Sequence, residues 1–450
     1  MTKMLPKAPP GLTPRNPTRY GPIMLIRSRN KQIPTTPGAR ADGASMRAHN
    51  TGLLLHHIFE QEPISRAALA RTTGMARSTV GAIVGELVEA GVLTESPGTA
   101  RRAGRPPIAL RVQANRFHIV GVEMGASHVT LVHTNLRGTV LGRCSVDHPV
   151  ERDPEGALAT IRRLIDALVP PADRPRLVGA GLAVPSPLDP TAPGRLSERI
   201  LPAWAGVRPA HSLGERLGLP VYMENDANLG ALAEAWWGRG RGRGDFAFIK
   251  LATGVGAGMI VSGEIYGGAS GIAGEIGHTT IDPSSDHQCR CGRHGCLEAL
   301  IGTHSLVGRA LAEMTNGAKT RLQPAGLDLA SLIDAAHAGD PLATDLMRQA
   351  GHQLGTAIAN LLNLLNPGAV VLGGTLPTAG PVLLDAMRAA MRERVLSASL
   401  ETTDVLVSSL GEDGIALGAA TLVLQRVLAE PALLLQSRAE TAELGASQTA

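Results

Sequence analysis

Apolar residues recur at helical spacing between about Arg77 and Ala90, and this is the clearest local pattern near the start of the chain. The large aliphatic side chains fall three and four positions apart, which places them on one face of a helix. They are Val80, Ile83, Val84, Leu87 and Val88. Arg77, Ser78 and Thr79 lie on the other side, near the expected N-terminus. The pattern therefore predicts an amphipathic helix whose leading end is polar and basic.

Two shorter helices and a hairpin complete the same segment. A first helix is expected near Thr51–Glu60, and Ser65 is a good N-cap for a second one. A tight turn separates the second helix from the third, and strands are expected from Val92 and over Ile108–Val112. Helices, turn and hairpin in this order predict a winged helix-turn-helix domain over residues 46–112.

The polar end of the third helix and the hairpin loop make this domain a candidate DNA-binding unit. Arg77, Ser78 and Thr79 would reach base edges or phosphates in the major groove. The loop of the hairpin carries three arginines among small residues, and arginines presented in this way suit a narrow minor groove. They are Arg101, Arg102 and Arg105. The alternatives are a winged helix that contacts another protein and a helical hairpin with a basic loop.

Beyond residue 117 the pattern changes to strands, in two similar groups. The first group, with its helix, is expected over 117–124, 129–135, 140–146, 154–168 and 177–184. The second group is expected over 246–251, 256–261, 264–266, 345–365 and 369–372. This succession predicts an α/β body of two lobes, and it resembles the duplicated ribonuclease H-like fold of actin and the hexokinase-like sugar kinases.

Charge is distributed unevenly along the chain. Residues 1–45 hold eight Lys or Arg against one acid, and residues 46–112 hold eight Arg against five Glu. Since the whole chain has a net charge of +4, the remainder is acidic. The basic front indicates an anionic partner, most simply a double-stranded DNA operator, although a solvated tail explains the charge of residues 1–45 equally well.

The two ends of the chain lack the patterns of folded segments. Residues 1–45 are rich in Pro, Thr and Arg without apolar periodicity, which predicts a disordered basic extension. Residues 426–450 are predicted to be a disordered tail. No run approaches the ~18 consecutive apolar residues of a membrane span. Prolines also interrupt the N-terminal segment where a secretory signal needs an apolar run. We therefore expect a cytoplasmic protein without membrane contact.

Four cysteines in 450 residues are too few for a disulfide scaffold. Three of them cluster at Cys289, Cys291 and Cys296. With His278 upstream they offer three sulfurs and one imidazole, the closed tetrahedral set of a structural Zn²⁺ site. The closed set leaves no position for a catalytic water. The alternative is three free thiols with other histidines nearby.

Six sequence blocks resemble the ROK family (repressor, open reading frame, kinase) and occur in the family's order over residues 117–425. They are VGVEMG at 120–125, ENDAN at 224–228, TGVGAG at 253–258, GIAGEIGH at 271–278, CRCGRHGCLE at 289–298 and LNPGAVVLGG at 365–374. With the winged helix, the resemblance extends over about 46–425. It implies a kinase-like body in which the zinc stabilises a loop beside a sugar pocket.

The resemblance also implies which residues form that pocket. Asp226 matches the base that takes the proton of the attacking sugar hydroxyl in family members with kinase activity. Asn225 matches the residue that holds neighbouring hydroxyls, and Glu275, His278 and Glu298 match the family's other sugar contacts. Taken alone, an Asn-Asp pair is also typical of a turn or a helix cap.

The phosphate-binding loops depart from the family pattern. The nucleotide contacts that the resemblance implies are Glu123, Gly125, Thr253, Gly254, Gly256, Gly258, Gly373 and Gly374. The aspartate of the first loop is replaced by Glu123, and its second glycine by Ala126, which restricts the approach of the backbone to phosphate. These two changes argue against efficient use of ATP and Mg²⁺.

Two functions of different classes follow. The first is a sugar-responsive transcriptional regulator, a repressor of carbohydrate-use genes that binds a sugar or sugar phosphate in its cleft. The second is an ATP-dependent sugar kinase with an accessory DNA-binding module, which the intact Asp226 favours. The winged helix and the altered loop favour the regulator, and we predict a regulator that is not an enzyme. Because paired modules read a longer site, we expect a homodimer or homotetramer.

Overall fold

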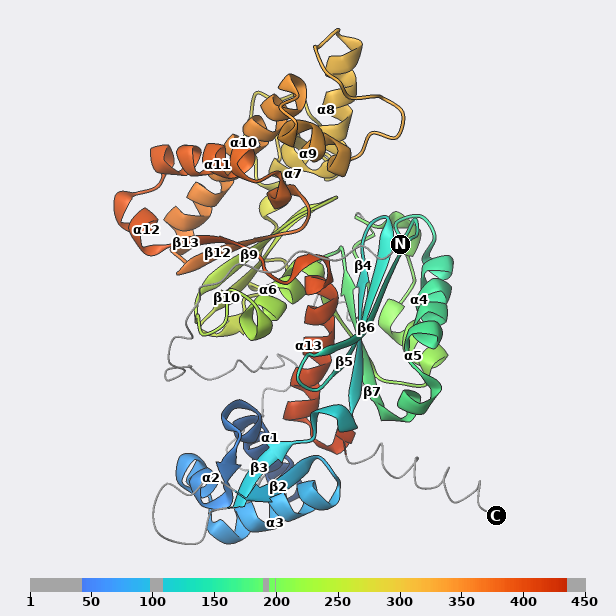
Figure 1. Ribbon diagram of the computed structural model, residues 1–450, viewed down its shortest axis with the longest axis vertical. Coiled ribbons are helices and arrows are strands. Elements are labelled where there is room, and N and C mark those ends of the chain that lie inside the picture. Colours follow the sequence, from blue (N-terminus) through green and yellow to red (C-terminus); the bar gives the residue numbers. More distant parts are fainter. Residues whose placement is uncertain (1–42, 98–107, 189–193, 199, 435–450) are drawn as a thin grey trace, which may run out of the picture.

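The computed structural model describes residues 43–97, 108–188, 194–198 and 200–434, and these form a small N-terminal module and two larger α/β lobes (Figure 1). The first lobe follows the module in sequence, and the second lobe lies at the opposite end of the molecule from the module. Within the described ranges, none of the helices combines the length and the hydropathy that crossing a bilayer requires.

The N-terminal module combines helices with a small antiparallel sheet in the order β1-β3-β2. Its elements are α1 (Gly43–Gln61), β1 (Ile64–Ser65), α2 (Arg66–Thr73), α3 (Arg77–Glu89), β2 (Leu93–Pro97) and β3 (Ile108–Val112). The Ser65 hydroxyl caps α2 by accepting the Ala68 N–H, and Gly74 ends the helix at a φ of 70°. The apolar stripe of α3 is buried as its spacing predicts, with Val88 half-buried at its end.

Helix α1 begins earlier than its apolar pattern predicts, at Gly43 rather than near Thr51. The added turns are held by an ion pair between Arg47 and Glu86 of α3, and by the Thr51 hydroxyl, which donates to the Arg47 carbonyl. The predicted disordered extension is therefore corrected at residues 43–45, which are helical. Residues 1–42 lie outside the described ranges.

The first lobe is built on a sheet in the order β6-β5-β4-β7-β8. Its elements are β4 (His118–Met124), β5 (His128–Asn135), β6 (Val140–Asp147), α4 (Pro154–Leu168), β7 (Leu177–Val184), α5 (Pro209–Leu217) and β8 (Val221–Asn225). Strands β4 and β7 are buried along their whole length, whereas the edge strand β6 alternates between exposed and half-buried residues. The continuous apolar runs of the sequence thus form the centre of a sheet that is covered on both faces.

The second lobe repeats this order as β11-β10-β9-β12-β13. Its strands are β9 (Phe246–Leu251), β10 (Val255–Val261), β11 (Glu264–Ile265), β12 (Ala369–Gly373) and β13 (Asp404–Val407). Its helices are α7 (Leu297–Ile301), α8 (Thr303–Thr315), α9 (Leu329–His337), α10 (Pro341–Leu365), α11 (Pro381–Arg394) and α12 (Ser397–Thr402). In each lobe the first three strands are antiparallel and the last two join in parallel. The repeated order confirms the predicted two-lobed α/β body.

Helices α6 (Asp226–Trp237) and α13 (Gly414–Ala429) pack side by side between the lobes (Figure 1). A Cβ atom on Gly121 would lie 1.9 Å from the Ala416 carbonyl oxygen, and one on Gly418 would lie 1.9 Å from the Leu229 carbonyl oxygen. Glycine at these two positions lets α13 approach both β4 and α6 closely.

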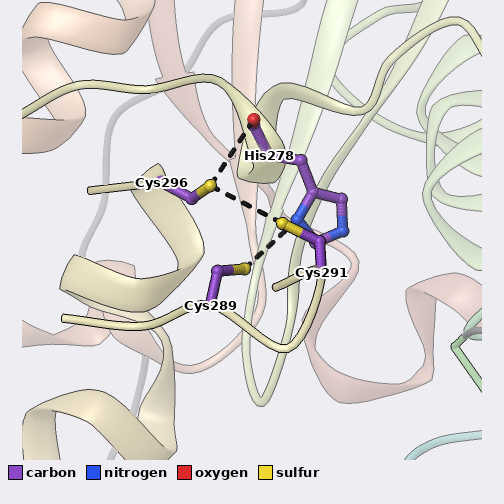
Figure 2. Close-up of side chains that lie close together, drawn as sticks. All are labelled: His278, Cys289, Cys291 and Cys296. Atoms are coloured by element: carbon purple, nitrogen blue, oxygen red, sulfur yellow. Dashed lines mark hydrogen bonds between the residues drawn. The ribbon is translucent and has the colours of Figure 1, made fainter. Parts of the chain in front are cut away.

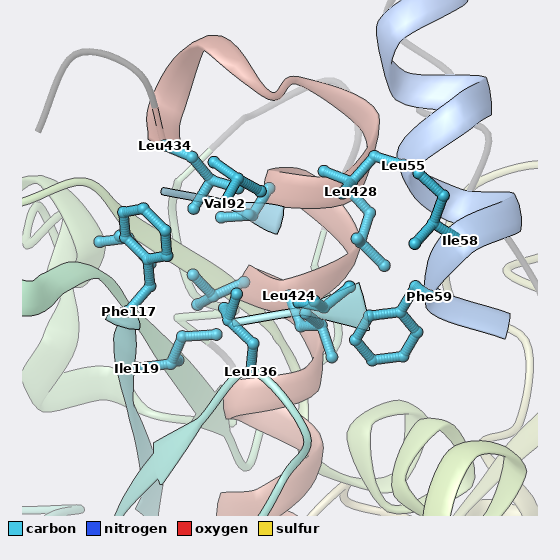
Figure 3. Close-up of a cluster of buried hydrophobic side chains, with 14 of the residues drawn as sticks. Leu55, Ile58, Phe59, Val92, Phe117, Ile119, Leu136, Leu424, Leu428 and Leu434 are labelled. Carbon is cyan, nitrogen blue, oxygen red and sulfur yellow. The ribbon is translucent and has the colours of Figure 1, made fainter. Parts of the chain in front are cut away.

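The end of α13 reaches the N-terminal module and shares its hydrophobic core (Figure 3). Leu424 and Leu428 lie in the same cluster as Leu55, Ile58 and Phe59 of α1. The prediction of a disordered tail from residue 426 is therefore wrong for residues 426–434, because apolar side chains there are buried against the module. Residues 435–450 lie outside the described ranges.

Candidate functional site

The five residues predicted to bind sugar line one cleft between the two lobes. Asn225 and Asp226 come from the junction of β8 and α6 in the first lobe. Glu275 precedes a short 3₁₀ turn of the second lobe (Ile276–His278), His278 is its last residue, and Glu298 lies in α7. The structure thus brings together residues that are spread over 74 positions of the sequence, from 225 to 298.

Asn225 is both a helix cap and a cleft residue. Its Oδ1 accepts the Ala227 and Asn228 N–H groups at 3.0 and 3.2 Å, which caps the N-terminus of α6. Its Nδ2 donates to the Ser186 carbonyl at 3.3 Å. The cap therefore fixes the side chain of Asn225 at the start of α6, beside Asp226.

Asp226 forms an ion pair that the sequence analysis did not anticipate. The Nζ of Lys250, in β9 of the second lobe, donates to Asp226 Oδ2 at 2.5 Å, and both residues are buried. Burial alone would lower the pKa of Lys250, but the carboxylates of Asp226 and Glu123 raise it above its ordinary value. Lys250 is thus a fixed ammonium against the carboxylate that kinases of the family use as a base. The signal for it was a single lysine inside the apolar strand FAFIKL.

Glu298 is held by two donors at the base of the cleft. Arg290 Nε donates to its Oε1 at 2.8 Å, and the Val255 N–H donates to its Oε2 at 2.9 Å. Glu275 lines the same cleft, where burial and the carboxylates of Asp226 and Glu298 raise its pKa. The cleft is therefore rich in hydrogen-bond acceptors, which suits recognition of hydroxyl groups.

His278, Cys289, Cys291 and Cys296 converge on one point, with ligand atoms all within 4.8 Å of one another (Figure 2). Zn–S bonds of about 2.3 Å in a tetrahedral site place neighbouring sulfurs about 3.8 Å apart. Cys291 Sγ and Cys296 Sγ are 3.8 Å apart, and Cys289 Sγ lies 3.4 Å from His278 Nδ1. The cluster therefore has the donor set and the spacing to hold a metal ion.

Proton affinities in this cluster also fit a metal site. Burial raises the pKa of the Cys289 thiol to about 12, so at neutral pH it would lose its proton to solvent only when a metal ion binds the thiolate. Burial lowers the pKa of His278, which favours the neutral imidazole that a metal requires.

The residues predicted to bind nucleotide are less well placed. His128 Nε2 lies 3.7 Å from Glu123 Oε1, and a Cβ atom on Gly125 would lie 2.2 Å from His128 Cε1. The imidazole thus covers the loop after β4. A Cβ atom on Gly258 would lie 2.2 Å from the Ala227 carbonyl oxygen, so packing of α6 on β10 already accounts for this glycine.

The remaining predicted nucleotide contacts are divided between two places. Gly254 and Gly256 line the cleft beside Lys250. Thr253 precedes them in the turn between β9 and β10, and Gly373 and Gly374 lie at the end of β12. A Cβ atom on Gly373 would lie 2.4 Å from the Phe248 ring, so packing accounts for that glycine too.

The predicted DNA contacts fall into two groups. Arg77 and Ser78 are exposed at the start of α3, and Thr79 is half-exposed beside them. Arg101, Arg102 and Arg105 lie outside the described residues.

Comparisons with known proteins agree with the two-lobed body. A family model described as the ROK family matches residues 119–426. The xylose repressor of Bacillus subtilis (strain 168) is 29% identical over 394 residues, which cover 86% of this chain and 98% of the repressor. The DNA-binding transcriptional dual regulator NagC of Escherichia coli (strain K12) is 28% identical over 403 residues, which cover 87% and 97%.

Solved structures give the same picture. A ROK family transcriptional regulator, a homologue of the E. coli MLC protein, matches with a TM-score of 0.73 and 26% identity over 87% of this chain and 98% of its own. A ROK family glucokinase from Streptomyces griseus, in complex with glucose and AMPPNP, matches with a TM-score of 0.60 and 28% identity over 68% and 98%. The relatives thus favour the predicted transcriptional regulator over the kinase. The family match over most of its length shows that the chain belongs to the ROK family.

Proposed function

We propose that this protein is a sugar-responsive transcriptional repressor of carbohydrate-use genes, in which a sugar bound in the cleft controls DNA binding by the N-terminal module. The observation that carries the proposal is the extent of the matches. The match to the xylose repressor covers 98% of the repressor and 86% of this chain. The match to the glucokinase also covers 98% of the kinase, but only 68% of this chain. What distinguishes this chain from the kinase is thus a segment that it shares with the repressors.

The N-terminal module has the features of a winged helix-turn-helix that binds an operator in double-stranded DNA. Helix α3 buries its apolar stripe and exposes Arg77 and Ser78 at its N-terminal end. The β2–β3 hairpin flanks it, and its connecting residues include Arg101, Arg102 and Arg105. Arginines in both places would contact phosphates and base edges of the operator.

A test of this step is fluorescence anisotropy with a labelled fragment of the protein's own promoter. Arg77→Ala should weaken binding and reduce the slope of log K against log salt by about one, because one phosphate contact is lost. Arg392→Ala, an equal charge change on α11 of the second lobe, should leave both values unchanged. Equally tight binding by a chain that lacks residues 46–112 would contradict the proposal.

Helix α6 supports control of the module by the cleft. It begins at Asp226, and near its other end Trp236 packs against Phe59 of α1, with ring centroids 5.9 Å apart. The Arg137 guanidinium lies over the same Phe59 ring, 3.9 Å from its centroid. A change at the sugar site can therefore reach the module through one helix.

The metal cluster is proposed to hold a structural Zn²⁺ ion. His278, Cys289, Cys291 and Cys296 would be its four ligands, which leaves no position for substrate. Bound zinc would supply folding energy to the loop that presents Glu275 and His278 to the cleft. Elemental analysis of the purified protein should find close to one zinc per chain, and its absence would refute the assignment.

An ATP-dependent sugar kinase is the second candidate, because Asp226 is present and lies in the cleft. The Lys250 ion pair and the imidazole over Gly125 both count against it. A coupled assay of ADP release over a panel of sugars separates the two functions. Sugar-dependent turnover would establish the kinase.

We also propose a cytoplasmic homodimer or homotetramer, since two modules would read a two-fold site. Light scattering should give a multiple of the 46.7 kDa chain mass. A species of single-chain mass at micromolar concentration would contradict this.

A further inference from the structure

The charged groups of the cleft indicate whether it accepts a free sugar or a phosphorylated one. This inference rests on the function proposed above. Among the described side chains that line the cleft, two are permanently cationic, Lys250 and Arg290. A phosphate group would need such cations, or free backbone N–H groups, as partners. Both of these cations are already paired with carboxylates of the protein.

Lys250 is committed to Asp226. The ammonium and the carboxylate are 2.5 Å apart, with Lys250 8% and Asp226 5% exposed. Turning Lys250 toward a ligand would leave Asp226 as a buried carboxylate without its partner, which is strongly unfavourable. Its charge is therefore neutralised before any ligand enters.

Arg290 is committed to two glutamates. Its Nε and Nη2 atoms donate to the two oxygens of Glu298 at 2.8 and 3.4 Å, and Nη1 donates to Glu151 at 3.3 Å. The Val255 N–H, in the glycine-rich turn, also donates to Glu298, at 2.9 Å. The turn that would cradle phosphate in a kinase thus has this amide directed at a carboxylate.

The carboxylates of the cleft favour hydroxyl groups over phosphate. Asp226 and Glu298 are paired with the two cations, and Glu275 adds a third carboxylate to the lining, so the acids outnumber the cations. A sugar hydroxyl can donate to these oxygens, whereas a phosphate would bring further negative charge against them. We propose that the cleft selects an uncharged sugar and discriminates against the phosphorylated form of the same sugar.

Isothermal titration of the full-length protein with matched pairs tests this. The pairs are glucose with glucose 6-phosphate, and N-acetylglucosamine with N-acetylglucosamine 6-phosphate. For any pair that binds, the uncharged member should bind more tightly by roughly tenfold or more, as expected for one uncompensated charge at close range. Equal or tighter binding of the phosphate would overturn the inference and leave the proposed regulator standing. Binding of neither member of either pair, nor of xylose, would overturn the sugar-responsive function and this inference with it.

A pair of variants isolates the electrostatic cause. Glu151→Gln removes one acceptor of Arg290 at the edge of the cleft, so the preference for the uncharged sugar should fall by roughly twofold to fivefold. Glu155→Gln makes the same charge change on α4, where Glu155 pairs with Arg216 instead, and should leave the preference unchanged. An identical preference in both variants would contradict a role for the pairing of Arg290.

Discussion

The residues predicted to bind sugar and those predicted to bind nucleotide form two sides of the cleft, and the two sides differ in how their side chains are arranged. On the sugar side, Asn225, Asp226 and Glu298 are held in place by a helix cap, an ion pair and two donors. On the nucleotide side, the His128 imidazole covers Gly125 and lies beside Glu123. Both sides belong to the same pair of sheets with the same strand order. The residues predicted to bind sugar thus stay open to the cleft, whereas the loop predicted to bind phosphate is covered by a side chain of the protein itself.

Lys250 lies on the border between these two sides. It pairs with Asp226 of the sugar side, and the Glu123 carboxylate of the nucleotide side also raises its pKa.

Loss of the metal cluster should damage the sugar side most. Cys291→Ser removes a thiolate, so we expect metal content to fall and the free energy of unfolding to drop by more than about 5 kcal/mol. Release of operator DNA by sugar should be lost as well. Chemical denaturation and elemental analysis measure these effects, with Cys144→Ser in β6 as a control outside the cluster. If a metal-free variant still releases operator DNA in response to sugar, the metal cluster does not support the sugar pocket.

Removal of the border lysine should come next. Lys250→Met leaves Asp226 buried without its partner, which we expect to cost about 3–5 kcal/mol of stability. The double variant Lys250→Met with Asp226→Asn has no buried charge at this position and should recover most of that loss. The coupling energy from the four proteins measures the ion pair directly. Additive effects would show that the two side chains do not interact.

A smaller effect is expected at the helix cap. Asn225→Ala removes the acceptor of two N–H groups of α6, which we expect to cost about 1 kcal/mol. Affinity for sugar should fall as well, because this side chain fixes the start of α6 in the cleft. Asp328→Ala, which removes the cap of α9 in the second lobe, should cost a similar stability without loss of sugar affinity. If the two variants bind sugar with equal affinity, Asn225 does not contribute to sugar binding.

The smallest effect concerns a histidine pair away from both sides of the cleft. His118 Nδ1 and His133 Nε2 are 3.0 Å apart and buried, and burial lowers the pKa of each below its ordinary value of 6.5. Just below pH 6.5 the unfolded chain therefore binds protons at these two histidines that the folded chain does not bind. The contribution of the neutral pair to the free energy of unfolding is complete above pH 6.5 and is lost as the pH falls from 6.5 through the lower pKa values of the folded state. His133→Gln should reduce this acid sensitivity in denaturation measured from neutrality to about pH 5.5, and an unchanged slope would contradict the assignment.

Much of the fold follows from local patterns in the sequence. The bounds of α4 and β7 are those that the apolar periodicity predicts, because each element has one face or a continuous run to bury. The extent of α13 was missed, because Leu428 near its end is buried in a cluster to which residues of the N-terminal module contribute as well as residues of the first lobe. A pattern along one segment cannot identify a partner surface that lies elsewhere in the chain.

The candidate site shows the same division. Cysteine spacing and motif blocks identified the four residues that converge as a possible metal site and the five residues that line the cleft, whose roles in binding zinc and sugar stay predictions. Lys250 and Arg290 were not predicted, since their roles depend on Asp226, Glu151 and Glu298, which come from other elements and in part from the other lobe. A charged residue in an apolar strand was the available signal, but it does not specify which acid it meets.

In the proposed function, the cleft binds sugar as an effector and does not transfer phosphate to it. The most direct measurement titrates the protein–operator complex with xylose, glucose and N-acetylglucosamine, with and without Mg-ATP, while DNA release and ADP are followed in the same sample. We expect that a sugar releases the DNA, that Mg-ATP does not alter the midpoint of this release, and that no ADP forms above background. Sugar-dependent ADP formation, or release that requires Mg-ATP, would contradict the proposed function.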